Sequence, residues 1–207
     1  MEKFVVIEAR SRLVLRKLQE SDELNPWKFV RFSDFLRTFA CTKLKITHMK
    51  VTEQDRQMMR EAIRLSAESV EKGGGPFGAV IAKDGQVIAG TSNSVTLLND
   101  PTAHAEVTCI REACRKLGTF DLSGCKIYTS CEPCPMCLGA IYWAHLDCIF
   151  YANTRTDAAD IDFDDDFIYR ELEKPMEQRS TPIIQLLRKE ALTVFRTWSL
   201  KEDKAEY

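Results

Sequence analysis

The 207-residue sequence predicts an α/β fold, a three-layer α/β/α sandwich with a mixed central sheet. Two observations support this class. Two strand patterns separated by a two-residue turn predict a β-hairpin, and two later strand patterns are each reached through a predicted helix. Helix-linked strands that follow a hairpin imply a mixed sheet with helices packed on its faces.

The first predicted helix begins at a capped turn. The sequence Thr-Glu-Gln-Asp at 52–55 is typical of a helix N-terminus, where side chains accept from the free backbone N–H groups. Four later residues recur at helical spacing: Met59, Ile63, Ser66 and Val70. The three glycines at 73–75 end this helix.

A hairpin follows this helix. Phe77–Lys83 and Gln86–Ser92 are strand patterns, and Asp84-Gly85 between them is a two-residue turn signal. Helices and strands then alternate: a helix that begins at Asp100-Pro101, runs to about Leu117 and is ended by Gly118, a strand from Lys126 to Ser130, a helix from Pro135 to His145 and a strand from Cys148 to Ala152.

The composition is that of an ordinary globular protein, with 44% hydrophobic and 29% charged residues. A chain of this length can bury a substantial core in one domain. Eight cysteines would suggest disulfides in a small secreted protein, but the sequence has no signal-peptide pattern and no apolar span that would cross a bilayer. We therefore expect reduced cysteines, a cytoplasmic location and no membrane partner.

The net charge of −2 and the pI near 6.0 bear on the class of ligand. Proteins that bind nucleic acid usually carry a basic patch that neutralises phosphates, and that footprint is weak here. A small molecule is therefore the expected partner, and nucleic acid is not.

The first 48 residues differ in charge from the remainder. They carry ten Lys and Arg against six Asp and Glu, about +4, which leaves about −6 for residues 49–207. This segment lacks the Ser-rich, acid-poor character of a transit peptide. We interpret residues 1–48 as a basic N-terminal extension, either sequence upstream of a natural initiator at Met49 or a docking arm, and residues 49–207 as the folded domain.

The most informative pattern joins one histidine, one carboxylate and two thiols. His104–Glu106 is followed about thirty residues later by Pro133–Cys137. Zinc prefers four-coordinate sites of imidazole and thiolate, and a catalytic site leaves one position open for water. His104, Cys134 and Cys137 are therefore candidate zinc ligands. The order H-x-E and then P-C-x-x-C is typical of zinc-dependent deaminases.

Glu106 lies two residues from the histidine and is the candidate catalytic residue. A carboxylate beside a metal-bound water can take its proton and return it to a leaving group. We expect Glu106→Ala or Glu106→Gln to leave zinc bound and to remove nearly all turnover.

The local sequence places these residues at helix N-termini. Cys134 and Cys137 begin the helix that opens with Pro135, where the helix dipole and the free N–H groups favour thiolates. Residues two apart do not share a helix flank, so His104 and Glu106 can converge only near the first turn of their helix. The site is expected where two helix N-termini meet.

Two other interpretations of the cysteines remain open. Cys131 could act as a fourth ligand and close the site into a structural zinc knot, which would make the chain an interaction module and not an enzyme. Cys134 and Cys137 could instead form a redox pair, although that motif requires no H-x-E partner.

From Met49 to Tyr207 the chain resembles the bacterial guanine deaminases of the cytidine-deaminase-like superfamily. The zinc motifs alone fit any superfamily member. The narrower resemblance is carried by six runs: Gly74–Ile81, Asn99–Val107, Thr129–Ala144, Phe163–Asp165, Phe167–Tyr169 and the terminal Glu206-Tyr207. It implies a cytidine-deaminase-like fold, one zinc ion per subunit, and hydrolysis of guanine to xanthine and ammonia with Glu106 carrying the protons.

The resemblance also implies a substrate pocket. Five residues match family positions at the purine: Asn93 and Asp165 as hydrogen-bonding groups, Phe77 and Trp143 as apolar walls, and Tyr207 as a C-terminal cap. The Asp165 carboxylate could accept from the N–H and amino donors of guanine, or it could be the N-cap of a following helix. Tyr207 could instead be a frayed terminus.

Members of this family are described as dimers that exchange C-terminal segments. A homodimer in which Tyr207 completes the partner's site is therefore expected. The segment Pro182–Trp198 is rich in apolar residues, as a docking arm requires, although these residues could equally pack within one chain.

Two other activities share parts of the pattern. A tRNA adenosine deaminase has the same zinc motifs but needs a basic groove for a flipped base in RNA. A guanosine deaminase needs only a sugar-sized space near the C-terminal cap. Ammonia release from guanine, guanosine, cytosine and adenosine would separate these enzymes from a structural zinc module, which would release none.

Overall fold

The computed structural model describes residues 50–205 of the chain. The predicted extension at 1–48 and Tyr207 lie outside the described residues, so both stay predictions. The described helices and strands follow one another in this order: α3 (Glu53–Glu71), β1 (Gly78–Lys83), β2 (Gln86–Ser92), α4 (Val95–Leu98), α5 (Ala105–Leu117), β3 (Cys125–Cys131), α6 (Pro135–Trp143), β4 (Cys148–Asn153), α7 (Arg155–Ala159), α8 (Asp166–Glu173), the 3₁₀ turn η2 (Met176–Gln178) and α9 (Arg188–Ser199).

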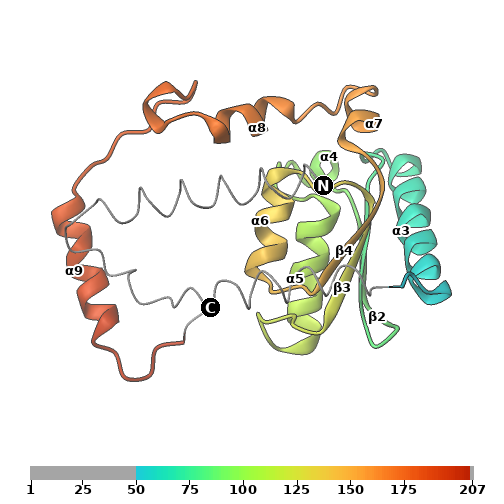
Figure 1. The fold of residues 1–207 in the computed structure, drawn as a ribbon, viewed down its shortest axis with the longest axis horizontal. Coiled ribbons are helices and arrows are strands. Elements are labelled where there is room, and N and C mark those ends of the chain that lie inside the picture. Colours follow the sequence, from blue (N-terminus) through green and yellow to red (C-terminus); the bar gives the residue numbers. More distant parts are fainter. Residues whose placement is uncertain (1–49, 206–207) are drawn as a thin grey trace, which may run out of the picture. The chain divides into compact units, whose positions relative to one another are not determined.

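The four strands of the described range form one sheet in the order β2-β1-β3-β4. Strand β1 runs antiparallel to both β2 and β3, whereas β3 and β4 run parallel and are joined through α6. Helix α3 packs on one face of this sheet, and α5 and α6 lie on the other (Figure 1). The predicted three-layer sandwich with a mixed central sheet is therefore confirmed.

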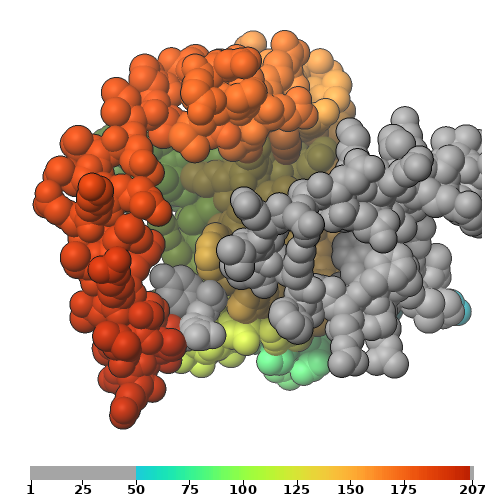
Figure 2. All heavy atoms as spheres, turned by 60° about the vertical axis from the view of Figure 1, so that its left-hand side comes forward, coloured from blue at the N-terminus to red at the C-terminus, as the bar shows by residue number. Residues whose placement is uncertain are grey.

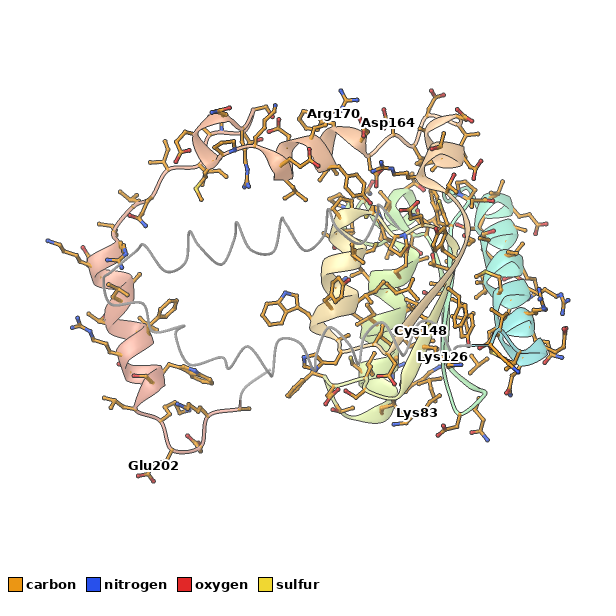
Figure 3. All side chains as sticks on the ribbon, viewed as in Figure 1. Lys83, Lys126, Cys148, Asp164, Arg170 and Glu202 are labelled. Atoms are coloured by element: carbon orange, nitrogen blue, oxygen red, sulfur yellow. The ribbon has the colours of Figure 1, made fainter. Side chains whose placement is uncertain are left out.

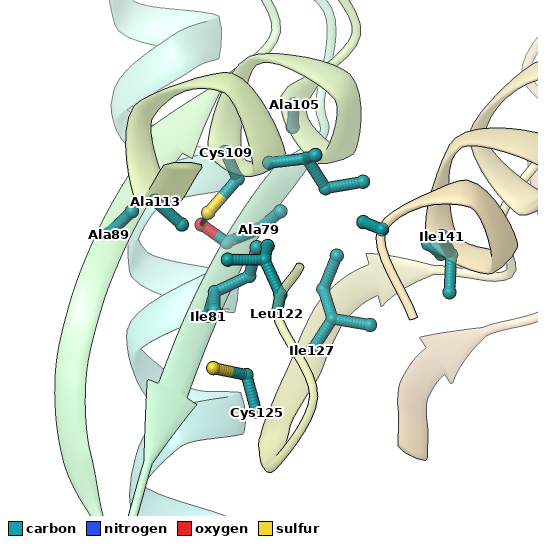
Figure 4. Close-up of a cluster of buried hydrophobic side chains, with 12 residues drawn as sticks. Ala79, Ile81, Ala89, Ala105, Cys109, Ala113, Leu122, Cys125, Ile127 and Ile141 are labelled. Carbon is teal, nitrogen blue, oxygen red and sulfur yellow. Dashed lines mark hydrogen bonds between the residues drawn. The ribbon is translucent and has the colours of Figure 1, made fainter. Parts of the chain in front are cut away.

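Alternate residues of the strands fill two separate cores, because successive side chains of a strand point to opposite faces. Ala79 and Ile127 lie in the larger cluster, which includes side chains of α5 and α6 (Figure 4). Val80 and Tyr128 lie in the smaller cluster, which includes side chains of α3. The same alternation places Thr129 of β3 on the α5 side of the sheet.

The predicted start of α3 is confirmed. The Asp55 backbone N–H donates to Thr52 Oγ1 at 3.1 Å, and the Thr52 backbone N–H donates to the Asp55 carboxylate at 2.8 Å. The helix stops before Gly73, whose φ of 83° is left-handed. Gly78 on β1 is needed for close packing, because a Cβ there would lie 2.3 Å from the Ala62 carbonyl oxygen of α3.

The predicted hairpin is also confirmed. Asp84 and Gly85 have φ values of 49° and 77°, and this left-handed pair is the backbone of a two-residue type I′ turn. Its twist matches that of the strands on either side. Lys83 therefore pairs directly with Gln86.

The predicted start of the second helix was wrong. Helix α5 begins at Ala105, not at Asp100. Asp100 Oδ1 accepts from the backbone N–H and the hydroxyl of Thr102 at 2.8 and 2.7 Å, and the Asp100 carbonyl accepts from Ala103 N at 3.0 Å. An aspartate that bonds the backbone two residues on competes with the helix. The helix N-cap is therefore His104, in extended conformation.

The C-terminal segment carries apolar side chains that the described residues leave exposed. They come from the extended stretch before α9 and from α9 itself, and include Ile184, Leu186, Leu187, Val194, Phe195 and Trp198. Figure 2 shows this segment in orange to red. Within residues 50–205 no helix combines the length and apolar character that a membrane crossing requires.

Candidate metal centre and active site

The three predicted ligands converge where α5 and α6 begin. His104 is the N-cap of α5, Cys134 is the N-cap of α6, and Cys137 lies in the first turn of α6 after Pro135. His104 Nδ1 lies 3.6 Å from Cys134 Sγ and 3.6 Å from Cys137 Sγ. The three ligand atoms all lie within 4.8 Å of one another. The predicted meeting of two helix N-termini is the arrangement found.

These distances fit a zinc ion. In a tetrahedral site, Zn–N bonds of about 2.0–2.1 Å and Zn–S bonds of about 2.3 Å place the nitrogen and sulfur atoms about 3.6 Å apart. Both nitrogen–sulfur distances in this cluster are 3.6 Å, so the ligand atoms need not move to bind the ion. Mixed imidazole and thiolate donors also favour zinc over harder divalent ions.

Cys131 does not join this cluster. Its Sγ donates to the Thr154 carbonyl oxygen at 3.5 Å, and burial raises the pKa of its thiol to about 11. Among the described residues, the group that could hold a metal contains His104, Cys134 and Cys137 alone. A fourth protein ligand is absent from this group, which leaves one coordination position for solvent and argues against a structural knot.

Cys134 is prepared to bind metal as a thiolate. Hydrogen bonds from the Cys137 thiol, the His104 ring and the Cys137 backbone N–H lower the pKa of Cys134, although burial acts in the opposite direction. The start of a helix supplies such donors because its first N–H groups have no partner in the helix.

Glu106 lies in the first turn of α5 and is 6% exposed. Its Oε1 accepts from Thr129 Oγ1 at 3.1 Å, and its Oε2 accepts from Cys137 Sγ at 3.4 Å. Burial raises the pKa of Glu106, because few donors compensate for the loss of water. A carboxyl group beside a metal ligand with a raised pKa is suited to take up and release a proton.

A pocket of about 480 Å³ opens onto these residues. His104, Glu106 and Cys134 form one part of its lining. Phe77 and Phe163 form an apolar part, with their rings in edge-to-face contact at a centroid distance of 4.9 Å. The volume lies in the usual range for small-molecule sites.

Two of the predicted polar contacts line this pocket. Asn93 is buried, and its Oδ1 accepts from Val95 N at 3.3 Å, which fixes the orientation of the amide. Asp165 occupies the N-cap position of α8, but its side chain makes no capping hydrogen bond. Asp164 accepts from the backbone N–H of Asp166 instead, at 2.9 Å, so the Asp165 carboxylate is available to the pocket.

The prediction of Trp143 as a pocket wall is not supported by its position. Trp143 is the last residue of α6, whereas Cys134 caps the first turn of that helix, so about 13 Å of helix separates them. Its side chain is 66% exposed and is not among the residues that line the pocket. The physical reason is the rise of the helix, about 1.5 Å per residue, which keeps the two ends of α6 too far apart to lie at one site.

The site also includes residues that sequence reasoning missed, two at the pocket and one behind Glu106. Arg155 lines its mouth, with its guanidinium 4.9 Å from the centre of the Tyr169 ring. Glu132, which accepts from Arg155 N at 3.2 Å, lies beside it. Thr129 contacts Glu106 from β3. Their positions depend on strand register and loop course, so no local spacing identifies them, although Glu132 adjoins the Pro-Cys motif.

The fold and the site together define a zinc-binding deaminase domain. The family model of the cytidine and deoxycytidylate deaminase zinc-binding region matches residues 52–153. Guanine deaminase from Bacillus subtilis is 55% identical over 150 residues, which are 72% of this chain and 96% of that protein. An X-ray structure of guanine deaminase from Bacillus subtilis matches with a TM-score of 0.71 and 54% identity, covering 73% of this chain and 98% of that one.

More distant relatives match the chain as well. A guanine deaminase structure from Nitrosomonas europaea matches with a TM-score of 0.53 and 29% identity, covering 72% of this chain and 86% of that one. A tRNA-specific adenosine deaminase from Aquifex aeolicus is 43% identical over 94 residues, 45% of this chain and 62% of that protein. The chain therefore belongs to the guanine deaminases of the cytidine and deoxycytidylate deaminase family.

Proposed function

We propose that this protein hydrolyses guanine to xanthine and ammonia in a zinc-dependent reaction. The observation that carries this proposal is the placement of a buried carboxyl group beside three ligand atoms at zinc spacing. Glu106 Oε2 lies 3.4 Å from Cys137 Sγ, and the pocket is lined by both Glu106 and His104.

The residues of the chain divide the work of the reaction. His104, Cys134 and Cys137 would hold the zinc ion, which when bound activates a water molecule as a nucleophile. Glu106 Oε2 takes a proton from that water and delivers it to guanine N3 while C2 is attacked. Glu106 then takes the second proton from the new C2 hydroxyl group and passes it to the departing amino group, so that ammonia leaves and the C2 carbonyl of xanthine remains. Positioned proton transfer of this kind contributes about 10²- to 10⁴-fold to rate.

The pocket offers partners for the polar edge of guanine. We propose that the Asp165 carboxylate accepts from ring N–H and amino groups, that the Asn93 amide bonds a ring nitrogen or carbonyl, and that Phe77 packs on the ring face. Burial and the neighbouring Cys134 raise the pKa of Asp165, while Arg155 opposes that shift. A neutral base that binds beside Asp165 would bring no second charge into the pocket that needs a partner.

The charge of the pocket mouth favours a neutral base over RNA or a phosphorylated substrate. Four carboxylates line the pocket besides Glu106: Glu132, Asp162, Asp164 and Asp165. Asp164 is labelled in Figure 3, between α7 and α8. Within residues 50–205, Arg155 is the one lysine or arginine that lines the pocket. Phosphate groups would meet net negative charge here, which counts against the tRNA deaminase alternative.

We further propose that the protein is a homodimer in which the C-terminal arm crosses to the partner. Phe195 of α9 is 73% exposed, and Ile184 and Leu186 of the preceding stretch are more exposed still. Large exposed apolar surface is typical of sites where a protein contacts a partner. Sedimentation of the purified protein is expected to give twice the chain mass. A fully active monomer would contradict the exchange.

A cytoplasmic location suits this chemistry, because zinc requires reduced thiolates. All cysteines among the described residues are free thiols. The interpretation of residues 1–48 as an extension stays a prediction. A variant that begins at Met49 is expected to fold and to deaminate guanine at the full rate, and loss of either property would show that the extension is part of the working protein.

The test of the proposed function is a substrate panel on protein of measured zinc content. Guanine is expected to release ammonia, whereas cytosine and adenosine are not. Glu106→Gln protein with the same zinc content is the matched blank. Faster release from guanosine than from guanine would favour the nucleoside deaminase, and no release from any substrate would favour a structural zinc module.

A further inference from the structure

A buried hydroxyl group contacts the candidate catalytic carboxyl group from the sheet. Thr129 of β3 is 2% exposed, and its Oγ1 lies 3.1 Å from Glu106 Oε1 and 2.9 Å from the Cys131 carbonyl oxygen. No part of the reaction described above uses this residue. We propose that Thr129 is a positioning residue, which holds the Glu106 carboxyl group in the orientation that proton transfer requires. This inference rests on the proposed function.

The two oxygens of Glu106 have different neighbours. Oε1 faces Thr129, and Oε2 lies 3.4 Å from the thiol of Cys137, on the metal side. The last torsion of a glutamate side chain is broad and roughly two-fold, so the side chain alone does not fix the plane of its carboxyl group. A bond to Oε1 from a rigid strand therefore fixes Oε2 toward the metal ligands.

A hydroxyl group at this position can link the carboxyl group to the strand. Thr129 Oγ1 lies within hydrogen-bond distance of both Glu106 Oε1 and the Cys131 carbonyl oxygen, and a hydroxyl group has one donor and can also accept. Valine has a similar shape but offers neither donor nor acceptor, whereas serine keeps both.

A second threonine provides a matched control. Thr91 of β2 donates its hydroxyl proton to the Ala105 carbonyl oxygen at 2.7 Å, in the same first turn of α5. Thr91→Val therefore removes a hydroxyl bond to the same helix without touching the Glu106 carboxyl group. If Thr129 acted only by holding α5 in place, the two valine substitutions would have similar effects.

The experiment compares Thr129→Val, Thr129→Ser and Thr91→Val. Thr129→Val is expected to keep its zinc and to lower kcat about tenfold, because the catalytic group is misplaced. Its KM is expected to change by less than about twofold, since no substrate contact is lost. Thr129→Ser keeps the hydroxyl group and is expected to recover most of kcat, and Thr91→Val to retain it. If Thr129→Val does not fold, Thr129→Ala is compared with Thr129→Ser instead.

A structural readout separates this inference from the proposed function. In crystals of zinc-loaded Thr129→Val, or of Thr129→Ala if valine prevents folding, the Glu106 carboxyl group is expected to rotate or to take more than one orientation. An unchanged orientation, wild-type kcat in the valine variant, or no recovery with serine would overturn the role of Thr129. Failure of the wild-type protein to deaminate guanine would overturn the proposed function alone, because the crystals would still test the orientation.

Discussion

A buried carboxylate from a helix packs against each face of the sheet, and the two differ in their partners. Asp55, on the α3 side, is 4% exposed, and Glu106, on the α5 side, is 6% exposed. Asp55 accepts from Thr52 N, Thr52 Oγ1, Tyr128 Oη and Lys126 Nζ, at 2.6 to 3.1 Å. Among the residues that the structure describes, Glu106 has a hydroxyl group and a thiol as its side-chain donors.

The pKa values of the two groups shift in opposite directions as a result. Burial would raise the pKa of Asp55, but the hydrogen bonds from Thr52, Tyr128 and Lys126 outweigh it and hold the pKa well below its usual range. Burial dominates at Glu106 and raises its pKa. A buried carboxylate with many donors is fixed in one charge state, whereas one with few donors can exchange a proton. We therefore infer that the first stabilises the fold, and we propose that the second serves the reaction.

The largest effect is expected at the metal ligands on the α5 side. His104→Asn should lose zinc and lower turnover at least about 10³-fold, because the ion that activates water is no longer held. His145→Asn is the matched control, since asparagine tolerates the left-handed φ of 55° at that position. Zinc analysis and guanine turnover on both variants test this. An active His104→Asn enzyme would place the metal elsewhere.

A smaller effect is expected at the pocket wall. Asp165→Asn should raise KM for guanine about tenfold, because a neutral amide replaces a charge-assisted acceptor worth about 1.5–3 kcal/mol. Asp160→Asn, on the exposed end of α7, is the control and should leave KM unchanged. Steady-state kinetics with guanine provide the measurement. An unchanged KM in Asp165→Asn would assign this residue to the start of α8.

The smallest effect is expected on the α3 side, and it concerns stability. Tyr128→Phe removes the donor at 2.6 Å from Asp55 and should cost about 1.5–3 kcal/mol of unfolding free energy without changing turnover. Tyr151→Phe, at a half-exposed position, should cost less than about 0.5 kcal/mol. Urea denaturation of the three proteins measures both values. A loss of turnover in folded Tyr128→Phe would contradict the assignment of stability to the α3 side of the sheet and catalysis to the α5 side.

The same pair of proteins tests the direction of the Asp55 shift. A carboxyl group with a lowered folded pKa contributes stability above its unfolded value, about 3.9, and that stability is lost as the pH falls through the folded pKa. The stability difference between wild type and Tyr128→Phe should therefore be full at neutral pH and shrink below about pH 4. A difference that grows on acidification would contradict the lowered pKa.

Local features of the fold were predictable from the sequence. The capping box at Thr52, the turn at Asp84-Gly85 and proline at the first position of α6 are each encoded within four residues. The candidate ligands His104, Cys134 and Cys137 were found because the chemistry of zinc restricts residue type and spacing together. Their meeting point followed from helix starts, although the start of α5 was misplaced.

Features that depend on contacts between distant elements were not predictable. Asp55 meets Tyr128 across 73 positions of the sequence, and Thr129 meets Glu106 only because β3 lies under α5. The start of α5 was missed because a side-chain turn at Asp100 competes with the helix, and sequence alone does not rank the two. Trp143 does not line the pocket of its own chain, and a family match carries no information on which end of a helix a residue occupies.

The most direct measurement compares a substitution of each buried carboxylate for its effects on both turnover and stability. Glu106→Gln and Asp55→Asn are compared for guanine turnover per zinc and for unfolding free energy. Glu106→Gln is expected to lose about 10²- to 10⁴-fold in kcat with unchanged or higher stability. Asp55→Asn is expected to lose at least about 2 kcal/mol of stability with unchanged kcat in the folded protein. An active Glu106→Gln enzyme, or an Asp55→Asn protein that is fully stable but inactive, would contradict the assignment of catalysis to one face and stability to the other.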